Sequence, residues 1–389
     1  GKERPTISNP DGRPDQPYLQ VLKALPKLEE QGDGVRSYVG LLLHIIAGDH
    51  DVMLIDEPEA FLHPPQARLL GREIASQSAG KQSFIATHSA DFLQGIMSSN
   101  SPTTIVRITR SNLDDPVNHP AILSSEAVRT LWADPLLRHS NILDGLFHDA
   151  VVLCEADTDC RYYSAVMESI EDEDGRPAEG GSARRAPDLL FTHCGGKDRM
   201  PMVVNALGAA RVPVIVVTDF DILRNRAKLK QLIEAKGSSF DHVETWWNTV
   251  SSHLNSKYAP LNKSSLRDAL IAALDAIPGE QVDRDAANSL KSYLKPNDGW
   301  SQAKISGVAS LGSGNPANSC RSLLDALAKI GILVVPVGEL ERFDTRAGGH
   351  GTAWVATVFE NNYHKNPGHD ATEFVRSILS AATVSSSSP

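Results

Sequence analysis

Two apolar segments of this sequence are each followed at once by a pair of closely spaced acidic residues. Glu155 and Asp159 come after "AVVLC", and Asp219 and Asp221 come after "VPVIVVT". If a helix begins between Glu155 and Asp159, their four-residue spacing places both carboxylates on nearly the same helical face. Asp219 and Asp221 point to the same side if the strand continues through them. Both pairs could therefore bind a cation at the end of a strand.

A third apolar segment, "ILVVPVG", is followed by Glu339 and Glu341. Clustered carboxylates repel one another, which raises their pKa values unless cations intervene, and their oxygens are suitable ligands for Mg²⁺ or Mn²⁺, with Ca²⁺ as a possible substitute. Two such ions about 3.5–4 Å apart can activate water and stabilise the leaving oxygen of a phosphodiester. Glu341 could equally be a solvated or ion-paired residue. The expected ligands are Glu155, Asp219 and Asp221 for one ion, and Asp159 and Glu339 for the other, with Glu341 beside them.

The elements that must position these residues alternate between strands and helices, which predicts an α/β fold with a mainly parallel sheet and functional loops at the carboxyl ends of the strands. A first region has expected strands at "DVMLIDEP", "QSFIATHS" and "TIVRIT". A second has them at "AVVLC", "DLLFTHC", "VPVIVVT" and "ILVVPVG". Between the last two strands, residues 224–320 favour helices and contain Trp246 and Trp247, for which packing is a simpler explanation than stacking on bases.

The loop "HCGGKDRM" combines two glycines with two basic residues, which could hold a phosphate group. Gly195 and Gly196 would allow the backbone to approach the phosphate closely, and Lys197 and Arg199 could pair with its oxygens. A plain turn between a strand and a helix explains the same residues equally well.

The first region has the residue pattern of an ATPase. Asp56 and Glu57 end the strand "VMLIDEP", where the aspartate helps to hold Mg²⁺ and the glutamate polarises the attacking water. His88 ends the next strand, in a position to sense a γ-phosphate, and Gly32 and Gly34 lie in the loop "GDGVRSY" upstream. The sequence has no GxxxxGK[ST] loop to hold nucleotide phosphates. We therefore expect ATP binding only in a longer parent protein that supplies that lobe.

Composition narrows the possible partners and cellular compartment. The 38 basic and 48 acidic residues give a net charge of −10, which argues against a protein that coats nucleic acid over its whole surface. A polyanion would have to bind locally, or through cations. The four cysteines are far apart and suit reduced thiols in the cytoplasm. No segment is long enough to cross a membrane, and the beginning at "GKERP" suggests a fragment of a longer chain.

Taken together, the motifs resemble a known family. "VVLCEADTD", "THCGGKDRM", "VPVIVVTDFD" and "VVPVGELE" are similar to the successive motifs of a Toprim domain, most closely the version in the OLD (overcoming lysogenization defect) family of ATP-dependent nucleases. "VMLIDEPEAFLHP", the later histidine and "GDGVRSY" resemble the C-terminal lobe of the ABC-type or RecF-like ATPase that OLD proteins carry. The resemblance covers roughly residues 30–110 and 145–385.

The resemblance implies a bacterial, metal-dependent DNA endonuclease with a role in phage defence, coupled in the parent protein to an ATPase. Its implied partners are DNA, a second copy bound through the ATPase region, and a helicase. It also implies a lysine near the C-terminus that stabilises charge at the cleaved phosphate, for which Lys365 in "HKNPGH" is the candidate. The implied catalytic residues are Glu155, Asp159, Asp219, Asp221, Glu339 and Lys365.

We expect the domains to follow the same resemblance. They are a partial ATPase lobe at 1–110, a linker at 111–148, the first part of the Toprim domain at 149–223, a helical insertion at 224–320, and the second Toprim part with a C-terminal tail at 321–389. Two alternatives remain. A RecF-like or SMC-like structural ATPase would bind DNA without cutting it, and a topoisomerase or primase would use the Toprim domain for strand passage or primer synthesis.

Overall fold

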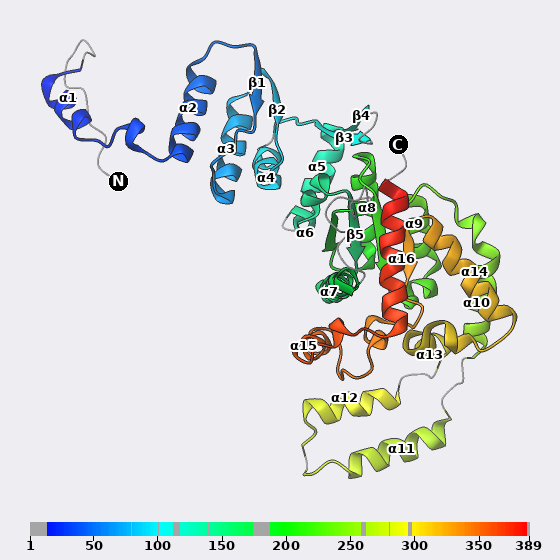
Figure 1. Cartoon of the computed structure of the whole chain (residues 1–389). Helices are drawn as coiled ribbons and strands as arrows, with labels where there is room; N and C mark the ends of the chain where they lie inside the picture. Colours follow the sequence, from blue (N-terminus) through cyan, green and yellow to red (C-terminus); the bar gives the residue numbers. More distant parts are fainter. Residues whose placement is uncertain are drawn as a thin grey trace. The chain divides into compact units, whose positions relative to one another are not determined.

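The computed structural model describes residues 14–386, except for 79, 100, 112–116, 139–140, 174–186, 258–261, 280 and 295–297. Backbone contacts divide the chain into two compact units (Figure 1). The first comprises Gly1–Thr104 and Ser124–Ala133, and the second comprises Ile105–Leu123 and Asp134–Pro389. Both contain parallel strands connected through helices, so the predicted α/β class is confirmed. The end of the predicted C-terminal tail, residues 387–389, lies outside the described part.

A two-stranded parallel sheet forms the centre of the first unit. Strand β1 (Val52–Asp56) pairs with β2 (Gln82–Ala86), and Met53 on one face of the sheet packs into a core with helices α2 (Asp33–Ala47), α3 (Pro64–Gln77) and α4 (Ala90–Ser98). Leu54, on the opposite face of the sheet, is 80% exposed. The unit also contains α1 (Gln16–Lys23), the 3₁₀ turn η1 (Leu28–Glu30) and α5 (Ser125–Ala133).

Helices α3 and α4 approach each other through glycines. A Cβ on Gly71 would lie 2.3 Å from the Phe92 carbonyl oxygen, and a Cβ on Gly95 would lie 2.1 Å from that of Arg68. Side-chain carbons do not approach carbonyl oxygens this closely, so both positions require glycine. The contact holds α4 in place directly after the β2 strand, which carries the loop with His88.

The strand expected at "TIVRIT" does not extend the parallel sheet. It forms β3 (Ile105–Ser111), which pairs antiparallel with β4 (Val117–Leu123). β4 lies in the segment that the sequence analysis assigns to a linker, residues 111–148. The Arg107 guanidinium explains this placement, since it donates hydrogen bonds to the main-chain carbonyl oxygens of Leu146, His148 and Arg211. The expected linker further contains α5, α6 (Pro135–Arg138) and η2 (Ile142–Phe147).

The second unit is built on four parallel strands in the spatial order β6-β5-β7-β8. From β5 the chain adds β6 on one side of the sheet, and then β7 and β8 on the other side. The connections that follow β5 and β7 therefore lead in opposite directions, and ligands of open α/β sheets bind at such a point. All residues of β5 and β7 are buried, which matches their continuous apolar sequences. The strands are β5 (Ala150–Cys154), β6 (Leu189–His193), β7 (Val214–Thr218) and β8 (Ile332–Val334).

Helices cover both faces of this sheet. On one face, α7 (Asp157–Glu173), α15 (Thr352–Glu360) and α16 (His369–Ser386) enclose a core that includes Tyr162 and Trp354 (Figure 1). On the other face, α8 (Met200–Ala209) and η2 pack beside Val151. The loops at the carboxyl ends of β5 and β7 stay outside these layers and carry the acidic residues.

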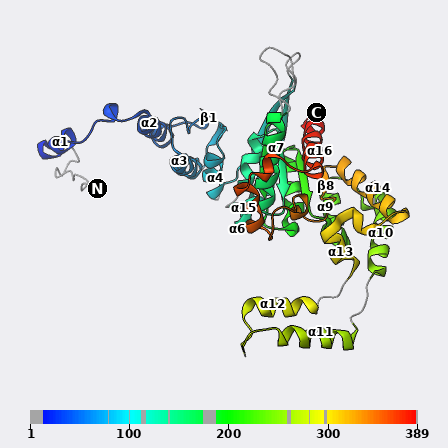
Figure 2. The same ribbon diagram turned by 60° about the horizontal axis from the view of Figure 1, so that its bottom comes forward.

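Between β7 and β8 the chain is helical, as the sequence predicts. Helix α10 packs against α14, and α11 lies beside α12 in both views (Figures 1 and 2). The Trp247 indole donates a hydrogen bond to the Leu223 carbonyl oxygen and meets the Phe240 ring edge-on, so it serves packing. The helices are α9 (Arg226–Ala235), α10 (Glu244–Ser256), α11 (Lys263–Asp275), α12 (Arg284–Tyr293), α13 (Gly299–Ser306) and α14 (Asn315–Lys329).

Short 3₁₀ turns connect several of these elements. They are η3 (Lys197–Arg199), η4 (Phe220–Arg224), η5 (Phe240–His242), η6 (Gly307–Leu311), η7 (Leu340–Phe343) and η8 (Tyr363–Lys365). None of the helices in the described part of the chain combines the length and apolar character needed to span a bilayer.

Candidate metal centre

The carboxyl ends of β5 and β7 bring the first predicted set of acidic residues together. Glu155 directly follows β5, and Asp219 directly follows β7 and precedes the turn η4 that contains Asp221. Glu155, Asp219 and Asp221 each offer one carboxylate oxygen such that these three atoms all lie within 4.8 Å of one another. An all-oxygen set of this kind suits a hard divalent cation such as Mg²⁺ or Mn²⁺.

Hydrogen bonds fix the orientation of the Glu155 side chain. Its Oε1 accepts a hydrogen bond from the Thr218 hydroxyl at 2.5 Å and another from the Asp219 main-chain N–H at 2.9 Å. Both donors belong to the end of β7, so the glutamate links the two central strands. Thr218 is a site residue that the sequence analysis missed, because a buried threonine at the end of a strand looks like an ordinary core position.

Burial and mutual repulsion disturb the acidity of this cluster. Burial, followed by the charges of Glu155 and Asp159, raises the pKa of Asp219 to about 8, although Lys197 acts in the opposite direction. Burial also raises the pKa of Asp159 to about 6, with smaller contributions from Glu155 and Glu341. A divalent cation would relieve these costs, so the donor set fits the ion that the sequence predicts.

Asp159 and Glu341 lie beside the first group, as their influence on its pKa values shows. Asp159 is in the first turn of α7, where its carboxylate accepts a hydrogen bond from the Ala156 N–H at 2.9 Å. Glu341 is in η7, where its carboxylate accepts one from the Gly351 N–H at 2.8 Å. Their carboxylates are therefore available as further ligands near the cluster.

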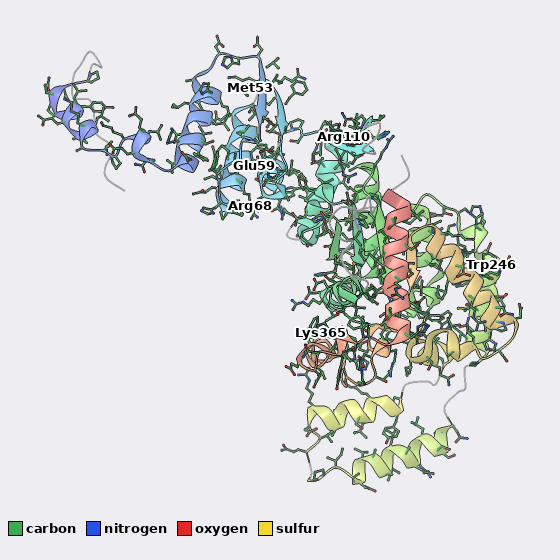
Figure 3. All side chains as sticks on the ribbon, in the orientation of Figure 1. Met53, Glu59, Arg68, Arg110, Trp246 and Lys365 are labelled. Atoms are coloured by element: carbon green, nitrogen blue, oxygen red, sulfur yellow. The ribbon has the colours of Figure 1, made fainter. Side chains whose placement is uncertain are left out.

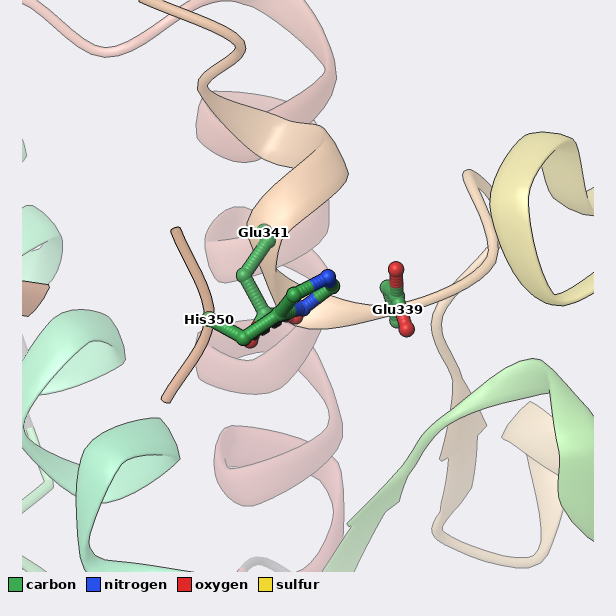
Figure 4. A group of neighbouring side chains, drawn as sticks. All are labelled: Glu339, Glu341 and His350. Atoms are coloured by element: carbon green, nitrogen blue, oxygen red, sulfur yellow. Dashed lines mark ion pairs between the residues drawn. The ribbon is translucent and has the colours of Figure 1, made fainter. Parts of the chain in front are cut away.

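A second possible group consists of Glu339, Glu341 and His350, whose ligand atoms also lie within 4.8 Å of one another (Figure 4). The His350 Nδ1 is 3.4 Å from the Glu341 carboxylate. Glu339 is 5% exposed and already has two basic partners, with Lys304 at 3.5 Å and Arg342 at 3.3 Å. Of the two glutamates, Glu341 is the one whose charge acts on Asp159 and Asp219.

The glycine loop presents its lysine to the acidic cluster. The Lys197 ammonium forms an ion pair with Asp221 and lies 3.3 Å from Glu155 Oε1. Gly195 and Gly196 have φ values of 69° and 124°, a region that favours glycine, and open space surrounds both. Arg199 pairs instead with Asp134 at 3.5 Å.

Lys365 is an exposed residue of the turn η8, which contacts α7, the helix that carries Asp159 (Figure 3). His364 in the same turn stacks on Phe359 at 4.7 Å between ring centroids. The basic residues of "RNRAKLK" each pair with a carboxylate, which favours a charged helix face over a track for DNA. These pairs are Arg224–Asp298, Arg226–Glu244, Lys228–Asp198 and Lys230–Glu234.

In the first unit, the predicted ATPase residues lie at the ends of β1 and β2. Asp56 ends β1 and is exposed, and Glu57 follows with a φ of 42°. The Glu57 carboxylate is 3.3 Å from His88 Nδ1. Gly32 precedes α2 and Gly34 lies in its first turn.

Glu59, which the sequence analysis did not single out, connects these two strand ends. It is 7% exposed, and its Oε1 accepts hydrogen bonds from the Thr87 hydroxyl and, at 3.3 Å, from the His88 N–H. The sequence signal is the last residue of "DEPE", the third acidic residue of this motif. Glu59 thus fixes the loop that contains His88 beside the carboxyl end of β1.

Comparison with known proteins supports the interpretation of the first unit. Residues 19–93 match the family model described as "AAA domain, putative AbiEii toxin, Type IV TA system". This chain therefore carries an AAA-type, ABC/RecF-like ATPase lobe over those residues. A search of the curated proteins gave no match.

Proposed function

We propose that the second unit is a metal-dependent DNA endonuclease of the Toprim type, similar to that of OLD nucleases, and that the parent protein couples it to the ATPase lobe. The observation that carries this proposal is the convergence of Glu155, Asp219 and Asp221 at the divergence point of a parallel sheet. Asp159 and Glu341 add two further carboxylates beside them.

These residues would hold one or two Mg²⁺ or Mn²⁺ ions through carboxylate oxygens, with Ca²⁺ as a substitute. When bound, such ions supply activation of water and charge stabilisation at a phosphodiester. The overall reaction adds water oxygen to phosphorus, breaks the bond to one sugar oxygen, and leaves a phosphate monoester and an alcohol. Asp159, which lies beside this ligand group and whose pKa burial raises to about 6, is suited to hold the proton that water releases.

Lys197 supports a polyanionic substrate for the same site. It is the basic side chain in direct contact with the carboxylate group, so a phosphate that approached the cluster would meet an ammonium there. A net charge of −10 is compatible with this mode of binding, because cations at the site provide the attraction locally.

The decisive test is incubation of supercoiled plasmid with purified protein in EDTA, Mg²⁺, Mn²⁺ or Ca²⁺. We expect nicking or linearisation in Mg²⁺ or Mn²⁺, and a loss of at least about 100-fold in Asp219→Asn and Glu155→Gln, as for removal of a principal group in an active site. Asp325→Asn, an exposed aspartate on α14, is the matched control and should cleave normally.

The outcomes separate the alternatives. If the protein binds DNA without metal and never cleaves it, and Asp219→Asn binds equally well, the nuclease proposal is wrong and a DNA-binding structural ATPase is favoured. Relaxation of the plasmid without strand breaks would instead favour a topoisomerase.

A further inference from the structure

The Lys197 ammonium interacts with the same two carboxylates that the proposed metal centre would use. It forms an ion pair with Asp221 and lies 3.3 Å from Glu155 Oε1, and its side chain is only 16% exposed. Glu155 and Asp221 also belong to the group whose ligand atoms lie within 4.8 Å of one another. The Lys197 ammonium is therefore a positive charge of the protein itself that already lies within the acidic cluster.

The polar contacts of these carboxylates show how closely the lysine is integrated. Glu155 Oε1 accepts hydrogen bonds from the Thr218 hydroxyl and the Asp219 N–H, and it also forms an ion pair with Lys197 Nζ at 3.3 Å. That oxygen is thus saturated, whereas Asp221 is bound through its Oδ1 to the lysine. A divalent ion that takes Asp221 as a ligand competes directly with the ammonium for the same carboxylate.

The lysine is placed where it can leave. Its loop begins with Gly195 and Gly196, and neither glycine has any atom within 4 Å of the position that a Cβ would take. The Gly196 carbonyl oxygen accepts hydrogen bonds from the Cys194 thiol and the Arg199 N–H. The lysine therefore leaves by rotation of its own side chain, which has four rotatable bonds. Lys230, on α9, is an exposed lysine that pairs with Glu234 on the same helix and serves as the control.

We propose that Lys197 is an exchangeable internal counter-ion of Glu155 and Asp221, which a divalent cation displaces and which then becomes available to a phosphate group of the substrate. Metal binding and polyanion binding at this site are therefore positively coupled: each ligand favours the state in which Lys197 has left Asp221. By linkage, the factor by which metal strengthens polyanion binding equals the factor by which the polyanion strengthens metal binding.

This inference rests on the proposed metal centre, but its test does not depend on cleavage. Metal affinity is measured by titrating the protein with Mn²⁺ in a calorimeter, and independently with Tb³⁺ by luminescence, at one fixed pH and without DNA. We expect Lys197→Met to bind Mn²⁺ about tenfold more tightly than the unmodified protein, because the ion no longer has to break the ammonium contacts. Lys197→Arg should restore the weaker affinity, and the control Lys230→Met, which breaks only an exposed pair within α9, should bind as the unmodified protein does.

A second measurement tests the coupling. A short DNA duplex with a non-cleavable phosphorothioate backbone is titrated by fluorescence anisotropy with and without Ca²⁺. We expect Ca²⁺ to strengthen binding several-fold in the unmodified protein, and this gain to shrink in Lys197→Met but not in Lys230→Met.

Each result has a distinct meaning. Equal or weaker Mn²⁺ binding in Lys197→Met, with circular dichroism that shows an intact fold, would overturn the exchange and make Lys197 a supporting residue of the metal site. If the unmodified protein binds no Mn²⁺, and Asp219→Asn behaves identically, the proposed metal centre itself is wrong.

Discussion

The most direct physical test of the acidic cluster is the stability of Asp219→Asn as a function of pH without metal. The carboxyl group has a pKa of about 8 in the folded protein, mainly because of burial and then because of Glu155 and Asp159. In the unfolded chain an aspartate has a pKa of about 3.9. Between these two values the folded state binds more protons than the unfolded state, so the free energy of unfolding falls as pH rises from about 4 to 8.

The size of the effect follows from this difference. A tenfold change in proton affinity corresponds to about 1.4 kcal/mol, so the full interval of about four pKa units sets an upper bound of about 6 kcal/mol. Because Asp159 and Lys197 can adjust their own protonation and position when Asp219 loses its proton, we expect about 2 kcal/mol. Asparagine carries no charge at any pH, so Asp219→Asn should be more stable than the unmodified protein at pH 8.5 by this amount, and equally stable near pH 4.5.

The assay is thermal unfolding by circular dichroism in EDTA at pH 4.5, 6.5 and 8.5, with Asp325→Asn as the control. About 2 kcal/mol corresponds to a Tm difference of about 5 °C in a unit of this size. Addition of Mg²⁺ at pH 8.5 should reverse the order, since only the unmodified protein keeps its full set of ligands. A variant less stable than the unmodified protein at pH 8.5 in EDTA, or a difference that does not depend on pH, would refute the reasoning.

Two further predictions concern packing and buried charge. Gly95→Ala should destabilise the first unit by about 2 kcal/mol or more, because its Cβ would lie 2.1 Å from a main-chain oxygen of the neighbouring helix. The control is Gly40→Ala in α2, where a Cβ meets nothing within 4 Å, and this variant should be as stable as the unmodified protein or more stable. Urea unfolding measures both effects. Equal effects of these two substitutions would contradict the close approach. Arg346→Met should cost about 2 kcal/mol, because it leaves Asp344, 4% exposed, without its basic partner. Arg267→Met, which breaks an exposed pair, should change stability by less than about 0.5 kcal/mol, and a similar loss in both variants would count against the buried pair.

Local sequence was sufficient to predict the central strands of both units. The segments at β1, β2, β5, β6 and β7 are apolar runs that end in polar residues, which is typical of strands in a parallel sheet. β5 and β7 are buried throughout, whereas β1 and β2 leave one face exposed. A strand was also predicted at β3, but its antiparallel pairing with β4 was not. Its partner β4 contains Pro120 and follows a polar segment, so it lacks the local pattern of a strand. What fixes β3 is the long-range contact of Arg107 with three main-chain carbonyl oxygens, which no local pattern reveals.

The candidate site was predictable in its acidic residues and less so in their arrangement. Asp219 and Asp221 would point to the same side if β7 continued through both residues, but the chain enters η4 after Asp219. It likewise enters η7 after Glu339, where Glu339 pairs with Lys304 and Arg342 while Glu341 influences Asp159 and Asp219. Lys197 was expected to meet a phosphate, but the nearest negative charges are those of the protein itself.

The balance of charge at this site argues for a function rather than a structural role. Five carboxylates gather at this site. Glu155, Asp219 and Asp221 form one group of ligand atoms, and Asp159 and Glu341 act on it through their charges, whereas Lys197 supplies a single positive charge. Replacing Asp219 by a neutral residue would remove a cost that rises with pH, so stability alone gives no reason for an aspartate at the end of β7. We propose that this cost is recovered in the metal-bound state, because a cation held at the carboxyl ends of β5 and β7 would offset the repulsion between these carboxylates.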